Sequence, residues 1–119
     1  MVALTTIITR SIDAARGSGT GFHSEGVVRR GTLQQTVLSL TEGTRLTEHE
    51  SEVPASIYVL HGAIRVEAPE PFVIQQGELH ELPDLRREVV AVQDAVLLLS
   101  AAVAAGQEGG LHDYVLAPE

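Results

Sequence analysis

The feature that most constrains the fold is a series of short, apolar-rich segments separated by turn residues between positions 31 and 100. The segments are residues 36–40, 56–61, 63–67 and 72–74, and the glycines that follow three of them are Gly43, Gly62 and Gly77. Segments of this length are typical of antiparallel strands, because an amphipathic helix needs its apolar pattern over a longer stretch. The sequence therefore predicts an all-β domain.

Length and composition set further limits. The chain has 119 residues, which suits one domain with its own hydrophobic core, and its 44% hydrophobic content is that of a globular protein. It has no cysteine, which excludes disulfides and thiolate chemistry. The 16 acidic residues outnumber the 8 basic ones, so we expect no nucleic-acid partner and no membrane partner. No signal-peptide pattern is present at the start, and we therefore expect a cytoplasmic protein.

Two segments are harder to assign. Residues 91–105 are apolar and rich in alanine, and periodicity does not separate a buried helix from a buried strand in such a stretch. We predict a strand from Val96 to about Ser100. Gly17, Gly19 and Gly21 lie close together, but their spacing fits neither a dinucleotide fingerprint nor a P-loop, so we predict a flexible loop.

A second pattern uses the same turns. Gly43 is followed after five residues by His49, and Gly77 is followed after five residues by Pro83. The further positions of this frame are Ser51, Ala55, Gly62 and Glu88. With these spacings the chain resembles the cupin superfamily, and specifically small single-domain cupins of the RmlC-like type. The resemblance implies a cupin-type double-stranded β-helix, or jelly-roll barrel, over residues 31–103, with an N-terminal strand and loop extension over residues 1–30 and a tail over residues 104–119.

The resemblance also implies where a metal would bind. In the family, two histidines and a glutamate of the first motif and a histidine of the second hold a divalent ion. The corresponding residues here are His49, Ser51, Ala55 and Glu88. Serine is a weak neutral ligand and alanine is none, so the usual four-ligand site is lost.

His80 adds one polar group, at a position that in similar cupins faces the barrel interior as an aliphatic residue. The candidate ligand-binding residues are therefore His49, Ser51, His80 and Glu88, and we assign no catalytic residue and no metal ligand. Two imidazoles and a carboxylate, from His49, His80 and Glu88, would suit Zn, Fe or Mn. The same residues would equally suit a metal-free pocket for a small polar ligand.

Simpler explanations stand beside these. His80 could be a core histidine bonded to a backbone carbonyl, and Glu88 follows Arg86 and Arg87, so a surface ion pair explains it as well. The remaining histidines are expected to be exposed: His23, His61 and His112.

Two classes of function follow. The first is a small-molecule-binding or accessory protein, and the alternative is a metal-dependent enzyme of the dioxygenase or isomerase type. We prefer the first, because the substitutions remove ligands and supply no catalytic replacement. Uncovered sheet edges predict a homodimer, and residues 111–116 are expected to extend across the partner as an added strand.

Overall fold

The computed structural model describes residues 3–47, 54–67, 69–82 and 88–102. The elements in these residues are, in chain order, α1 (Leu4–Gly17), β1 (Phe22–Arg30), β2 (Leu33–Leu40), β3 (Arg45–Thr47), β4 (Ala55–His61), β5 (Ala63–Glu67), β6 (Phe72–Gln75), β7 (Leu79–Leu82), β8 (Glu88–Ala91) and β9 (Ala95–Ala102).

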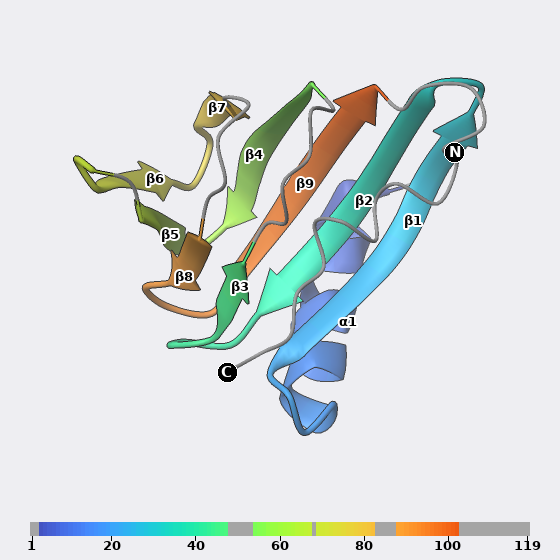
Figure 1. Cartoon of the computed structure of the whole chain (residues 1–119). Helices are drawn as coiled ribbons and strands as arrows, with labels where there is room; N and C mark the ends of the chain where they lie inside the picture. Colours follow the sequence, from blue (N-terminus) through green and yellow to red (C-terminus); the bar gives the residue numbers. More distant parts are fainter. Residues whose placement is uncertain (1–2, 48–53, 68, 83–87, 103–119) are drawn as a thin grey trace.

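The strands form two sheets that face each other (Figure 1). The larger sheet has the order β1-β2-β9-β4-β7, and the smaller sheet has the order β3-β8-β5-β6. Neighbours come from distant parts of the chain, since β2 pairs antiparallel with β9, and β3 pairs antiparallel with β8. The prediction of an all-β jelly-roll barrel is confirmed.

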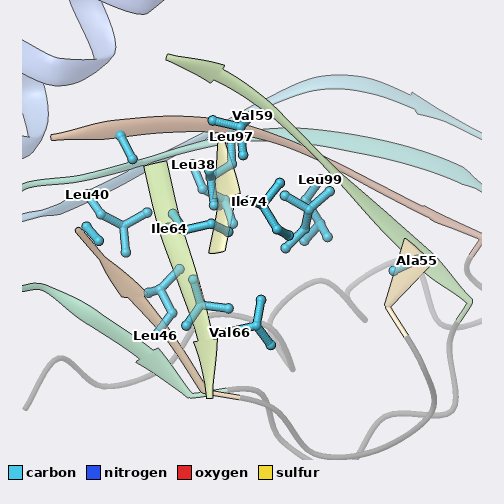
Figure 2. Packing of buried hydrophobic residues seen from close by; sticks show 14 of the residues in the cluster. Leu38, Leu40, Leu46, Ala55, Val59, Ile64, Val66, Ile74, Leu97 and Leu99 are labelled. Carbon is cyan, nitrogen blue, oxygen red and sulfur yellow. The ribbon is translucent and has the colours of Figure 1, made fainter. Parts of the chain in front are cut away.

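The core lies between the two sheets and is almost entirely aliphatic. Alternate residues of each strand point into it, as the pleat of a strand requires. Buried members from the larger sheet and the smaller sheet, seen in Figure 2, include Leu38, Leu40, Val59, Leu97, Leu99, Leu46, Ile64, Val66 and Ile74. Each such side chain stabilises the fold by roughly 1.5–3 kcal/mol relative to its exposed state, so the two facing sheets hold each other in place.

The predicted strand in the apolar stretch is confirmed. Residues 96–100 fall within β9, which lies in the middle of the larger sheet and pairs with β2 on one side and β4 on the other. Leu97 faces the core, and Val96 is buried on the opposite face under α1. Burial on both faces explains why this strand lacks an alternating pattern. Within the described part of the chain, no helix has both the length and the apolar character that a bilayer crossing requires.

The first thirty residues differ from the expected strand and loop. Residues 22–30 do form a strand, β1, but Leu4–Gly17 form a helix. Ile7, Ser11 and Ala15 recur every four residues on its buried face, and Ile7 packs on the outer face of the larger sheet with Val37 and Val96. The β-branched residues of positions 5–9 have weak helix propensity, so the packing of one amphipathic face stabilises this helix more than its intrinsic preference does.

One aspartate fixes the end of α1 to the barrel. The Arg16 guanidinium donates two hydrogen bonds to Asp94 Oδ2, at 3.1 and 2.6 Å, and the backbone N–H of Glu42 donates to Asp94 Oδ1 at 2.9 Å. The bond from Arg16, followed by the bond from Glu42, holds the pKa of Asp94 below its usual 3.8. Asp94 therefore joins the helix, the turn after β2 and the turn before β9.

Candidate ligand-binding site

His80 lies on the inner face of the larger sheet. It is opposite Ile57 in the pairing of β7 with β4, and Ile57 is a buried member of the core. The His80 ring is 4.6 Å from the ring of Phe72, measured between centroids, with the planes tilted by 47°. Because Phe72 belongs to β6 of the smaller sheet, His80 lies between the two sheets, where it is partly exposed.

The inner face of the larger sheet changes character along its strands. The row that contains His80 crosses four strands and consists of Thr36, Leu99, Ile57 and His80. The next row includes Gln34, Ala101 and Ala55, and Ala55 is paired in turn with Leu82 of β7. Gln34 is only 1% exposed although it carries an amide. On β2, β9 and β4, this row thus holds polar or small residues, whereas Leu38, Leu40, Leu97 and Val59 fill the other end of the inner face.

Ala55 stands where the resemblance implies a metal-binding glutamate. It lies on the inner face of β4 and belongs to the core cluster. In Figure 2 it lies at the far side of the cluster from Leu40. A methyl group offers no lone pair to a metal, so this position contributes packing instead of coordination.

Glu88 does not approach His80. On β8, Val89 and Ala91 belong to the core, so alternation turns Glu88 to the outer face of the smaller sheet. There its carboxylate pairs with Arg45 of the neighbouring strand. The expectation of an inward-facing Glu88 is therefore corrected. Its partner is Arg45, whereas Arg86 and Arg87 lie outside the described residues.

His49 and Ser51 also lie outside the described residues. Within the described ranges, no three His, Asp or Glu side chains are grouped so that they could hold a metal ion. The inner-face residues that are described, a single imidazole beside an alanine, do not fit a divalent metal. We therefore derive no chemistry through one.

The glycine-rich segment after α1 does not form a phosphate cradle. The Ser18 hydroxyl accepts hydrogen bonds from the backbone N–H groups of Thr20, Gly21 and Phe22, at 3.2, 3.1 and 3.3 Å. These amides, which would otherwise face a phosphate, are already bonded to the serine.

Two of the remaining histidines are described. His61 is exposed, as predicted, at the turn that contains Gly62, whereas His23 lies in β1 and is half-buried, so the prediction that it would be exposed is wrong. His112 lies outside the described residues. Neither His23 nor His61 lies in the row of His80, because His23 is opposite Ser39 and His61 is opposite Val96.

Comparisons with known proteins agree with this architecture. A conserved Streptococcus pyogenes protein of unknown function is 25% identical, with a TM-score of 0.62, over 69% of this chain and 74% of the other. An RmlC-like cupin from Shewanella frigidimarina is 16% identical, with a TM-score of 0.66, over 75% of this chain and 82% of that one. The chain has a small cupin fold.

Ectoine synthase from P. lautus shares this cupin fold, with 15% identity and a TM-score of 0.66 over 84% of this chain and 79% of that chain. No family model matches the sequence, and no curated protein matches it. The similar cupins differ in what they do, so the fold alone assigns no activity.

Sequence reasoning missed three residues of this site: Gln34, Thr36 and Phe72. A signal for the first two was present in the sequence. Gln34 and Thr36 are separated from Leu38 and Leu40 by even numbers of residues, and such residues share one face of a strand. The approach of Phe72 to His80 had no local signal, because it depends on how the two sheets pack.

Proposed function

We propose that this protein is a small-molecule-binding cupin with an accessory role, and that its ligand binds between the sheets beside His80. The observation that carries the proposal is the pairing of the inward-facing His80 ring with Phe72, with 4.6 Å between the ring centroids, in the row next to that of Gln34, Ala101 and Ala55.

The chemistry of these side chains favours a small polar ligand with a planar or apolar part. The imidazole of His80, the amide of Gln34 and the hydroxyl of Thr36 each offer hydrogen bonds, and the Phe72 ring offers an apolar surface. A barrel that needed only to exclude water would repeat large aliphatic side chains at both ends. Here the large aliphatic side chains of β2, β9 and β4 give way to Gln34, Ala101 and Ala55 in the row next to that of His80.

The alternative is a metal-dependent enzyme of the dioxygenase or isomerase type. It would need His80 and Glu88 at one metal ion. The described residues give it no support, because Glu88 faces outward from the smaller sheet and pairs with Arg45.

Protein-observed NMR with a collection of small polar metabolites tests the proposal. We expect a binder that shifts the amide signals of Thr36, Ile57 and His80. The variant His80→Ala should raise its dissociation constant by about tenfold or more, since a hydrogen bond in such a site contributes roughly 1–3 kcal/mol. His61→Ala, at an exposed histidine, should leave the constant unchanged. Binding that survives His80→Ala intact would contradict the proposal.

Elemental analysis of protein purified without an affinity tag separates the two functions. We expect no stoichiometric metal in the wild-type protein. Stoichiometric Zn, Fe or Mn that disappears in both His49→Ala and His80→Ala would refute the metal-free proposal and favour the enzyme.

A further inference from the structure

The inner face of the larger sheet continues beyond β2 onto the edge strand β1 (Figure 1). Gly26 is opposite Thr36 and so extends the row of His80, whereas Arg29 is opposite Gln34 and extends the next row. The Arg29 side chain is exposed, since β1 has a neighbouring strand on one side only. A cation therefore lies at the edge of the inner face, next to the two polar residues of β2.

A β-bulge turns Arg29 toward the inner face. Successive residues of a regular strand point to opposite faces, so Gly26 and Arg29, which are three positions apart, would not share a face. The register of β1 on β2 shifts between Gly26 and Val28, which leaves Val27 as an extra residue. Val27 packs with the cluster under α1, and Arg29 is opposite the inward-facing Gln34. Bulges are common next to functional sites, where they change the direction of a side chain.

Gly26 leaves room for the arginine side chain. A Cβ atom at Gly26 would lie 3.8 Å from Cδ of Arg29, which is van der Waals contact. The Arg29 side chain therefore folds back along β1 over Gly26, into the row that contains Thr36. The φ of Gly26 is outside the left-handed region, so the backbone conformation does not require a glycine here. What the missing side chain provides is space for Arg29.

Arg29 is the one charged residue on the inner faces of the strands that the structure describes. Glu25, the acidic residue of the same strand, is on the outer face and accepts a hydrogen bond from Arg10 of α1 at 2.7 Å. The charged residues of the smaller sheet alternate with core residues and so face outward: Arg45, Arg65, Glu67 and Glu88. In a chain with 16 acidic and 8 basic residues, this cation attracts small anions to the inner face.

We propose that the ligand carries a carboxylate and that Arg29 binds this group, with Gln34 and Thr36 beside it; the inference rests on the proposed function for the remainder of the ligand. A guanidinium offers two parallel N–H donors that match the two oxygens of a carboxylate. One cation balances one carboxylate, whereas a phosphate monoester carries close to two charges at pH 7. Because β1 and β7 are the two edges of the sheet, a ligand that also contacts His80 is an elongated acid with its planar or apolar end at Phe72.

Titration of the full chain with matched acids and amides, followed by protein-observed NMR, tests this proposal. The probes are phenylalkanoates of increasing length, from phenylacetate to phenylpentanoate, and their primary amides, which have nearly the same shape but no charge. We expect the best acid to bind more tightly than its amide and to shift the backbone signals of Arg29, Gln34 and Thr36. Arg29→Gln should raise the dissociation constant of the acid by about tenfold or more, and should leave that of the amide unchanged.

Arg30→Gln is the matched control. Arg30 is exposed and is opposite Leu33, so it lies on the outer face, and its replacement removes the same charge one position away. The affinity for the acid should be unchanged in this variant. Gly26→Val keeps every charge but puts a branched side chain where the Arg29 side chain folds over β1, so it should weaken binding of the acid. Unchanged affinity in Gly26→Val would refute this position of Arg29, and circular dichroism verifies that all three variants are folded.

Three results would overturn the proposal: no binding of any acid, equal affinities for acid and amide, or equal losses in Arg29→Gln and Arg30→Gln. The variant His80→Ala separates these results from a failure of the proposed function. A loss of affinity in His80→Ala but not in Arg29→Gln would refute the carboxylate contact and keep the site beside His80. A loss in Arg29→Gln but not in His80→Ala would keep the carboxylate contact and refute the site beside His80.

Discussion

Replacement of Gly62 by alanine should destabilise the barrel far more than replacement of another turn glycine. Gly62 joins β4 to β5 with a φ of +80°, in the left-handed region. A Cβ atom at this position would lie 2.2 Å from the carbonyl oxygen of Asp94 and 3.0 Å from Cα of Ala95. The chain passes so close that only glycine fits.

The cost has two parts. The left-handed conformation costs a residue with a side chain about 1–2 kcal/mol. The Cβ contact is also about 1 Å shorter than an ordinary carbon–oxygen approach, so the backbone of Asp94 must move. It cannot move freely, because Ala95 is fully buried and the Asp94 carboxylate is bonded to Arg16 and Glu42. Overpacking of this kind costs roughly 1–3 kcal/mol. Together, the two parts should lower the free energy of unfolding of Gly62→Ala by about 2–5 kcal/mol.

Gly43→Ala provides the matched control. Gly43 has a φ of +83°, but a Cβ there would have no atom within 4 Å. Gly43→Ala should therefore lower the free energy of unfolding only by the cost of the left-handed conformation, about 1–2 kcal/mol. Urea unfolding followed by circular dichroism measures both, with the slope m compared to verify that the same surface is exposed. Equal losses in the two variants, within about 0.5 kcal/mol, would refute the argument from the close approach.

Two further predictions follow from the ion pairs. Glu88→Gln should lower the free energy of unfolding by at most about 1 kcal/mol, because its pair with Arg45 is partly exposed, and it should leave ligand affinity unchanged in the NMR titration. A tenfold loss of affinity would instead place Glu88 in the site. The second prediction concerns Asp94, whose pKa is lower in the folded protein than in the unfolded chain. Its carboxylate therefore stabilises the fold fully at a pH above its pKa in the unfolded chain. This stabilisation is lost as the pH falls through its pKa in the folded protein. In urea unfolding, the difference in the free energy of unfolding between the wild-type protein and Asp94→Asn should therefore shrink as the pH falls below about 3.8. A difference that stays constant with pH would contradict this.

The arrangement of strands was largely predictable, because strands and turns leave local signals. Residues 36–40, 56–61, 63–67 and 72–74 all fall within or at the ends of observed strands. Gly43, Gly62 and Gly77 all have positive φ, as expected of sharp turns between them. Apolar alternation and turn chemistry act over a few residues, so one sequence suffices to identify them.

The face occupied by Glu88 was not predictable in the same way. Motif spacing counted from Pro83 assigns Glu88 to the metal-binding position, but strand pairing makes Val89 and Ala91 face the core. A shift of a single residue moves every side chain of a strand to the opposite face. Spacing alone does not fix that register, whereas the pairing of β8 with β3 and β5 does.

The sequence by itself determined the class of the fold, the turn glycines and the loss of a metal ligand at Ala55, because each depends on residue type and local pattern. Only the tertiary structure decided that Leu4–Gly17 form a helix, that His80 meets Phe72 and that α1 packs on β1, β2 and β9 of the larger sheet. These three features arise from contacts between residues far apart in the chain. Their free energy comes from burial against the sheets, which no short segment of sequence contains.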